Sequence, residues 1–135
     1  MIHIIVATHG KFAEGMEDTI NMFMGTPDNI SFLSFHQGES SDSYAERFKQ
    51  VFYGIKEDEI IVFNDILGGT PCKVAAEIAL QSEKQVEIVG GLNLPMLMQC
   101  CILSQDSLSQ IMDVIIKIGK DGVAKMDFYF LDEDD

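Results

Sequence analysis

The sequence is poor in basic residues, with nine Lys and Arg against 22 Asp and Glu and a net charge of −13. Such a charge argues against nucleic acid and anionic membranes as partners, because both attract positive surfaces. Long apolar runs are also missing, so no segment reaches membrane-spanning length. No basic stretch precedes an apolar one, as it would in a signal peptide. We therefore expect a cytoplasmic protein with no direct insertion into a membrane.

Cysteine is scarce as well, and two of the three cysteines, Cys100 and Cys101, are adjacent. Three cysteines at this spacing provide neither a disulfide framework nor a zinc site. Cys72 would lie in the first turn of a helix, where thiolates are stabilised, but a lone cysteine there is most simply a small core residue. We expect no metal site.

The apolar content, 47% of 135 residues, is sufficient for one domain (1–135) with a substantial core. Four apolar strands are predicted, and each is followed by a helical pattern or a helix start signal. The predicted strands are Ile4–His9, Ile30–Phe35, Ile60–Phe63 and Val86–Val89. The predicted helices are Phe12–Met24, Tyr44–Ile55, Thr70–Ser82 and a helical region from Pro95 that breaks near 104–106 and resumes over Leu108–Ile118.

Alternation of strand and helix predicts an α/β fold, an open doubly wound sheet of four parallel strands flanked by helices on both faces. Apolar residues at both odd and even positions give the first strand two apolar faces and place it in the middle of the sheet. The mixed pattern of Ile30–Phe35 suits an edge strand. Residues Lys125–Phe130 alternate like a further strand. The sequence leaves open whether that strand returns antiparallel to its own sheet or is exchanged with a second copy.

Three strand-to-helix loops converge at the carboxyl end of this sheet, the end at which its parallel strands finish. They contain His9, the segment Asp65–Thr70 and the segment Gly90–Pro95. In open α/β sheets, ligands bind at this end, and helix N-termini there attract anions. Thr70 followed by Pro71 is typical of an N-cap with proline at the first helical position. The sequence therefore predicts a site for a small anion.

His9 is the candidate nucleophile at this site. Near neutral pH an imidazole is largely uncharged and can attack phosphorus through one nitrogen while the other keeps its proton. Asp65 ends a strand that we expect beside the strand of His9, so its carboxylate is the natural partner for the protonated nitrogen. Phosphate ligands would come from the turn formed by Gly10, Lys11 and Phe12 and from a second set of residues: Gly68, Gly69 and the Thr70 hydroxyl.

Each feature taken alone has a simpler interpretation. The simpler interpretation of His9 is a strand cap, that of Asp65 is a turn residue, and that of the glycines before Pro71 is a turn. The conjunction of the three at one end of the sheet favours a functional site. His3 begins a strand at the opposite end and is interpreted as structural, whereas His36 follows the second strand and is a peripheral candidate.

Three motifs carry a resemblance to a known family: Ala7–Gly10, Asp65–Pro71 and Gly91–Met96. The sequence resembles the IIA component of the mannose family of the bacterial phosphoenolpyruvate-dependent sugar phosphotransferase system. The resemblance implies a phosphotransferase in which His9 takes a phosphoryl group from phospho-HPr and passes it to a IIB component, with membrane IIC and IID components downstream. It also implies that Asp65 orients His9.

The resemblance implies a homodimer that exchanges its final strand. The sequence departs from the family by ending soon after that strand, so we expect no fused IIB domain. No cofactor is expected, because the donor is the phosphohistidine of another protein. Two alternatives stay open: a phosphocarrier subunit associated with dihydroxyacetone kinase, and a non-catalytic regulatory module that binds a small anion. The sequence does not identify a sugar.

Overall fold

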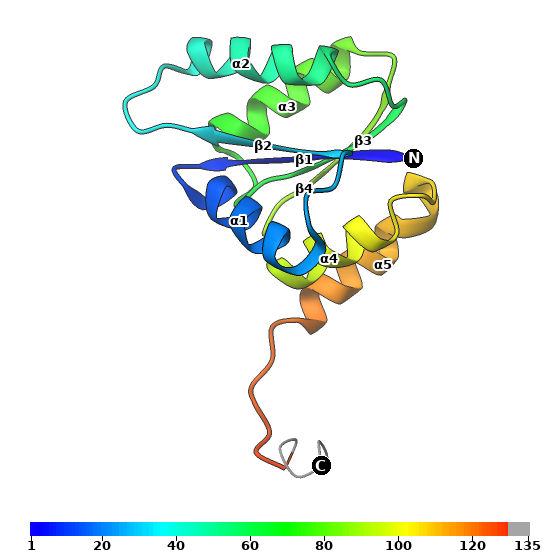
Figure 1. Cartoon of the computed structure of the whole chain (residues 1–135). Coiled ribbons are helices and arrows are strands. Elements are labelled where there is room, and N and C mark those ends of the chain that lie inside the picture. The colour runs from blue at the N-terminus through cyan, green and yellow to red at the C-terminus, as the bar shows by residue number, and fades with distance from the viewer. Residues whose placement is uncertain (130–135) are drawn as a thin grey trace.

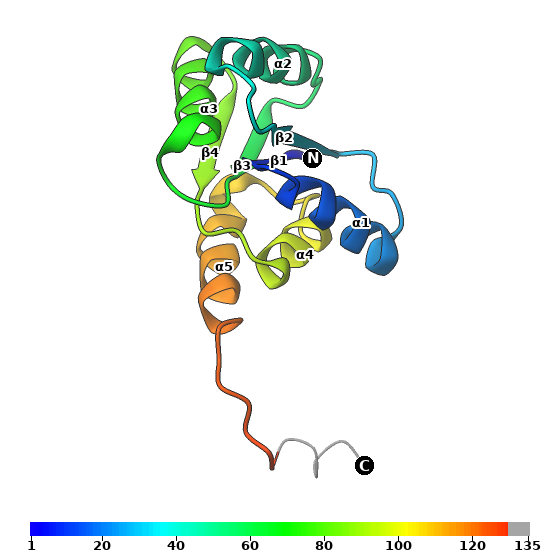
Figure 2. The same ribbon diagram turned by 90° about the vertical axis from the view of Figure 1, so that its left-hand side faces the viewer.

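The computed structural model describes residues 1–129 and shows a parallel sheet between two layers of helices (Figure 1, Figure 2). Helices α2 and α3 cover one face, and α1, α4 and α5 cover the other. Within the described residues, no helix is both long and apolar enough to cross a membrane. In chain order the elements are β1 (Ile2–His9), α1 (Phe12–Met24), β2 (Ile30–Phe35), α2 (Ser41–Tyr53), β3 (Glu59–Phe63), α3 (Gly69–Gln81), β4 (Gln85–Val89), α4 (Leu94–Ile102) and α5 (Leu108–Asp121).

The four strands lie in the order β2-β1-β3-β4, and all three neighbouring pairs are parallel. This confirms the predicted four-stranded parallel sheet, the central position of β1 and the edge position of β2. The chain moves from β1 to one side for β2 and returns to the other side for β3. The carboxyl ends of β1 and β3 therefore flank the point where strand order reverses, which is where open sheets bind ligands.

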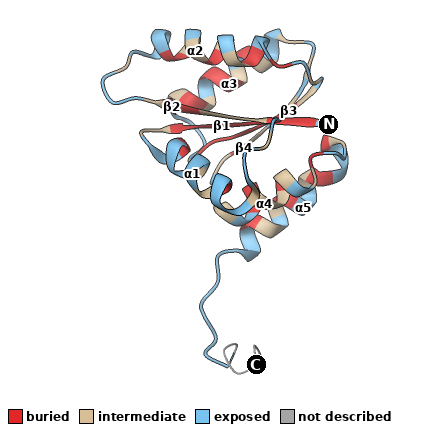
Figure 3. Ribbon diagram, in the orientation of Figure 1, coloured by how far each residue is buried: buried red, intermediate tan, exposed pale blue. Residues whose placement is uncertain are grey.

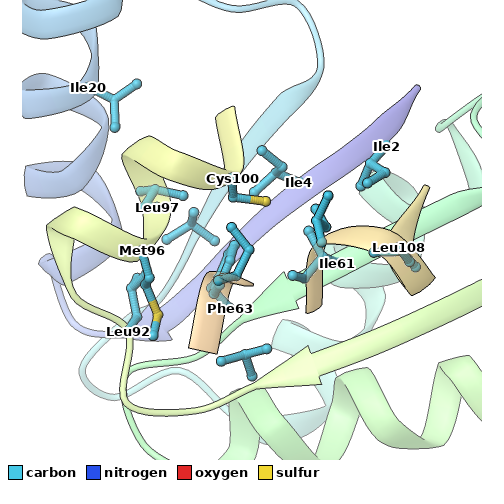
Figure 4. Close-up of a cluster of buried hydrophobic side chains, with 14 of the residues drawn as sticks. Ile2, Ile4, Ile20, Ile61, Phe63, Leu92, Met96, Leu97, Cys100 and Leu108 are labelled. Atoms are coloured by element: carbon cyan, nitrogen blue, oxygen red, sulfur yellow. The ribbon is translucent and has the colours of Figure 1, made fainter. Parts of the chain in front are cut away.

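The sheet separates two apolar cores, because side chains alternate between its faces along each strand. One core joins Ile4, Val6 and Phe63 to α1, α4 and α5, and Figure 4 shows part of it. The other joins Ile5 and Val62 to α2 and α3. Figure 3 shows β1 as buried along almost its whole length. A strand held on both faces provides a rigid base for the residue at its end, His9.

Helix α3 begins earlier than the sequence predicted. Its first residue is Gly69 and its N-cap is Gly68, whose φ of 80° is in the region that favours glycine. Thr70 is therefore not the N-cap, and Pro71 is the third helical residue. The glycine pair bends the chain into the helix before the threonine is reached.

Residues 125–129, in the predicted final strand Lys125–Phe130, do not form a strand in this single chain. They follow α5 as an exposed segment that leaves the body of the molecule (Figure 1). A strand needs a neighbour to pair with, and this segment meets no other strand here. Phe130 and the acidic residues 132–135 lie outside the described residues.

Candidate functional site

His9 and Asp65 meet at the carboxyl end of the sheet. His9 is the last residue of β1, and Asp65 lies two residues beyond the end of the adjacent strand β3. Asp65 Oδ2 lies 2.9 Å from His9 Nδ1 and accepts the backbone N–H of His9 at 3.2 Å. The predicted adjacency of the two residues is confirmed, and one carboxylate oxygen fixes both the ring and the backbone of the histidine.

This contact determines which ring nitrogen of His9 is free. An ionised carboxylate only accepts hydrogen bonds, so Nδ1 carries the proton and Nε2 carries the lone pair. The His9 side chain is 39% exposed, whereas that of Asp65 is 16% exposed. The His9 ring is therefore partly open to solvent, and the Asp65 carboxylate is sheltered.

Gly69 lies directly against the free nitrogen. A Cβ placed on Gly69 would be 3.0 Å from His9 Nε2 and 2.9 Å from Cε1, and its φ is +74°. Because α3 begins at this residue, the first N–H groups of the helix, which have no partner within the helix, start beside Nε2. Such a helix start stabilises negative charge, so a group attached to Nε2 would meet a favourable field.

In the turn after His9, one of the three predicted N–H groups is already hydrogen-bonded. The N–H of Gly10 donates to Phe35 O at 2.8 Å, so it is not free for an anion. The N–H of Ala13 donates to Thr8 Oγ1 at 2.8 Å. Lys11 and Phe12 are exposed at the start of α1. Helix α3 is therefore better placed than α1 to receive an anion at His9.

The remaining predicted phosphate ligands line a groove next to the histidine. Gly68, Gly69 and Thr70 border an open groove of about 660 Å³ between the beginnings of α2 and α3. Thr70 Oγ1 lies 3.3 Å from Ser41 Oγ, which connects the two helices. The exposed side chain of Lys73 lines the same groove together with Asp42 and Glu77, and Lys73 Nζ lies 4.0 Å from Glu77 Oε1.

Phe35 is a site residue that we did not predict. Its ring lies edge-on to the His9 ring with centroids 5.9 Å apart, and it packs in the same way on Tyr44 at 5.2 Å. Tyr44 is fully buried, so this aromatic contact supports the imidazole on the side of α2. Phe35 ends β2 and pairs with His9 in the parallel register, which the sequence of neither strand specifies alone.

His36 lies one residue beyond Phe35 and is exposed. Its N–H donates to Glu39 Oε1, and Arg47 donates to both oxygens of that carboxylate. The Arg47 guanidinium lowers the pKa of Glu39 to about 2. This ion pair joins the loop between β2 and α2, which contains His36, to helix α2.

His3 lies at the start of β1, at the opposite end of the strand from His9. It is buried, with Nε2 2.8 Å from Ser31 Oγ and Nδ1 3.2 Å from Glu57 Oε1. Burial lowers the pKa of His3, although the neighbouring Glu57 acts in the opposite direction. Its position and its hydrogen bonds support the predicted structural role.

Comparison with known proteins identifies related chains. Residues 3–117 match a family model described as the PTS system fructose IIA component, where PTS denotes phosphotransferase system. The PTS system mannose-specific EIIAB component of Escherichia coli K12 is 27% identical over 125 residues. That alignment covers 90% of this chain and 38% of the longer protein, so the chain spans well under half of that relative.

Two solved structures resemble the whole fold. The phosphotransferase system component EIIA from Streptococcus agalactiae is 27% identical, with a TM-score of 0.85, and the match covers 93% of this chain and 97% of that one. The PTS IIA protein associated with the fucose utilization operon of Streptococcus pneumoniae is 31% identical, with a TM-score of 0.78 and 92% of each chain covered.

Proposed function

This chain belongs to the mannose family of sugar phosphotransferase system IIA components, and on that basis we propose that it carries a phosphoryl group on His9. As a member of that family it is a phosphocarrier component of phosphotransferase type. The donor would be phospho-HPr and the acceptor a IIB component, with membrane IIC and IID components completing sugar uptake. The sugar itself would be selected downstream of this domain.

The observation that carries the proposal is the contact between His9 Nδ1 and Asp65 Oδ2 at 2.9 Å. It leaves the lone pair on Nε2, the ring nitrogen that lies beside Gly69. As Nε2 forms a bond to phosphorus, the bond from phosphorus to the histidine nitrogen of HPr breaks, and its electron pair stays on that nitrogen. The proton on His9 Nδ1 stays in place, where Asp65 stabilises the positive charge that the ring acquires.

The phosphoryl oxygens would lie beside the start of α3. The N–H groups that follow Gly68 and Gly69 are near Nε2, and Thr70 and Lys73 line the adjoining groove. Phosphoryl transfer depends mainly on positioning and charge stabilisation, and these groups supply both without a metal in our proposal. Transfer to IIB would use the same geometry in the opposite direction.

Apolar side chains around His9 support a protein as the partner. Phe12 begins α1, and Ile66 and Leu67 lie in the loop between β3 and α3; 47%, 56% and 71% of their respective surfaces are exposed. Exposed apolar groups around a reactive centre are typical of surfaces that bind another protein. Both HPr and IIB would cover these residues in turn.

The segment after α5 supports the proposed homodimer. Val123, Met126, Phe128 and Tyr129 are between 51% and 79% exposed in the single chain. Their burial against a second copy would remove this apolar surface from water. We propose that the segment pairs as an exchanged strand at the sheet of a partner, the arrangement that the family resemblance implies.

Phosphorylation by purified components tests the proposal. The chain is incubated with phosphoenolpyruvate, enzyme I and HPr, and its intact mass is followed with and without HPr. We expect one added phosphoryl group that requires HPr, is lost in acid and is stable in base, as a phosphoramidate should be. A module that only binds an anion would keep its unmodified mass, which would contradict the proposal.

Acceptor proteins separate the two possible carrier roles. The phosphorylated chain is mixed either with a IIB component or with the subunits of a dihydroxyacetone kinase. Discharge of the label to IIB supports sugar uptake. Discharge only to the kinase subunits would replace that role with the alternative.

A further inference from the structure

Asn64 connects three segments at the carboxyl end of the sheet. It follows the last residue of β3, precedes Asp65 and is fully buried. Its side-chain Nδ2 donates to Ala7 O of β1 at 2.7 Å. Its backbone N–H donates to Val89 O of β4 at 2.8 Å, and its carbonyl accepts the N–H of Leu92 at 3.1 Å. One residue therefore ties together the ends of β1 and β4 and the loop that leads to α4.

The side chain of Asn64 continues the hydrogen bonding between β1 and β3 one position beyond their last backbone pair. The register of these strands ends at Val6 opposite Phe63. At the next position the backbone of Asn64 bonds to β4, and the amide side chain alone reaches back to Ala7. Beyond this bond, the next contact between the two segments is that of Asp65 with His9.

We infer that Asn64 is a positioning residue, whose amide bond to Ala7 sets the distance between the Asp65 carboxylate and the His9 ring. Asn64 immediately precedes Asp65, and Ala7 lies two residues before His9. Loss of the bond would leave the ends of β1 and β3 free to separate at the point where the catalytic pair forms. This inference rests on the proposed role of His9 as the phosphorylated residue.

The amide oxygen of Asn64, Oδ1, is buried and has no hydrogen-bond partner among the described residues, which supports a role beyond stability. A buried polar atom without a partner costs free energy, and an apolar side chain of similar size would avoid that cost. An amide is therefore less favourable for stability here than an apolar side chain, except for the hydrogen bond that its N–H donates to Ala7.

Asn29 provides a matched control at the other end of the same strand. Its Nδ2 donates to Ile2 O at 2.8 Å, and its carbonyl accepts the N–H of Ile4 at 2.9 Å. Asn29 is also buried. The two asparagines make equivalent bonds to β1, but only Asn64 lies next to the site. Replacing each by leucine removes the donor and approximately keeps the shape.

The experiment compares Asn64→Leu and Asn29→Leu with the wild-type chain in three measurements: urea unfolding, the rate of phosphorylation by phospho-HPr, and the ¹⁵N NMR resonances of the His9 ring. We expect Asn64→Leu to lose no more stability than Asn29→Leu, because leucine also removes the unpartnered Oδ1 of Asn64. Asn64→Leu should slow phosphorylation by about 10- to 100-fold, since small displacements of reacting groups have effects of that size. It should also shift the Nδ1 resonance, which reports the bond to Asp65. Asn29→Leu should leave the rate and the resonance unchanged.

Two results would overturn the inference: a normal rate and normal His9 resonances in Asn64→Leu, or equal slowing in both variants. If Asn64→Leu does not fold, Asn64→Ala is measured in the same way and judged by the same criteria. A wild-type chain that phospho-HPr does not phosphorylate would refute the proposed function instead. The NMR comparison would then still decide whether Asn64 positions His9 against Asp65.

Discussion

Replacement of Gly69 by alanine should block the reactive nitrogen of His9 while leaving the fold intact. The new Cβ would lie 2.9 Å from Cε1 and 3.0 Å from Nε2. Ordinary carbon contacts are about 3.5 Å or longer, so the ring must move by roughly half an ångström. Asp65 and Phe35 contact the ring elsewhere and limit that movement. The methyl group would also occupy space that a phosphoryl group on Nε2 requires. We expect phosphorylation to slow by about 100-fold.

Gly25→Ala is the control for backbone strain. Gly25 has a φ of +73°, nearly equal to that of Gly69, but no atom lies within 4 Å of its added Cβ. Both substitutions should lower the unfolding free energy by about 1–3 kcal/mol, because alanine tolerates a positive φ poorly, and Gly25, with ψ −151°, lies in a region that is essentially restricted to glycine. Stability is measured by urea unfolding, and phosphorylation by intact mass at timed intervals. Equal phosphorylation rates in the two variants would refute the placement of the phosphoryl group beside Gly69.

Three further predictions follow from the site, from the opposite end of β1 and from the C-terminal segment. Asp65→Asn should lower the rate of phosphotransfer by about a thousandfold, because an amide neither enforces the tautomer nor stabilises the charged ring, and HPr binding measured by calorimetry should change little. Burial lowers the pKa of His3 below its ordinary 6.5, so the unfolded chain binds a proton more readily. Stability should therefore fall as pH drops below 6.5 until the lowered pKa is passed, and His3→Gln should remove that part of the decline in urea unfolding. Deletion from Val123 onward should abolish the dimer and cause aggregation in sedimentation experiments at micromolar concentration. A truncated chain that stays soluble and dimeric, or a wild-type chain that is monomeric, would contradict strand exchange.

The sequence predicted those features that depend on local pattern. Apolar runs of both parities identified β1 and β3 as buried parallel strands, and loop positions after those strands brought His9 and Asp65 to the same end of the sheet. The edge position of β2 followed from its mixed pattern. These features need no knowledge of how side chains pack.

Other features of the site depend on packing that no single segment encodes. The approach of Gly69 to His9 Nε2 depends on where α3 begins. The structure begins this helix at Gly69, whereas the sequence pattern predicted Thr70 as its N-cap. The contact of Phe35 requires the register of β2 with β1. The bond from Asn64 to Ala7 joins residues 57 positions apart. A strand at 125–130 would depend on a pairing partner, which the sequence of one chain does not specify.

The measurement that tests the central claim most directly is the location of the phosphoryl group. The chain is phosphorylated with phosphoenolpyruvate, enzyme I and HPr, digested at alkaline pH where phosphohistidine survives, and mapped by mass spectrometry. His9→Ala and His36→Ala are treated in parallel, since His9 ends β1 and His36 follows the neighbouring strand β2 at the same end of the sheet. We predict that the group is on His9, is absent from His9→Ala and is retained in His36→Ala. Phosphorylation that persists in His9→Ala and disappears in His36→Ala would contradict the account.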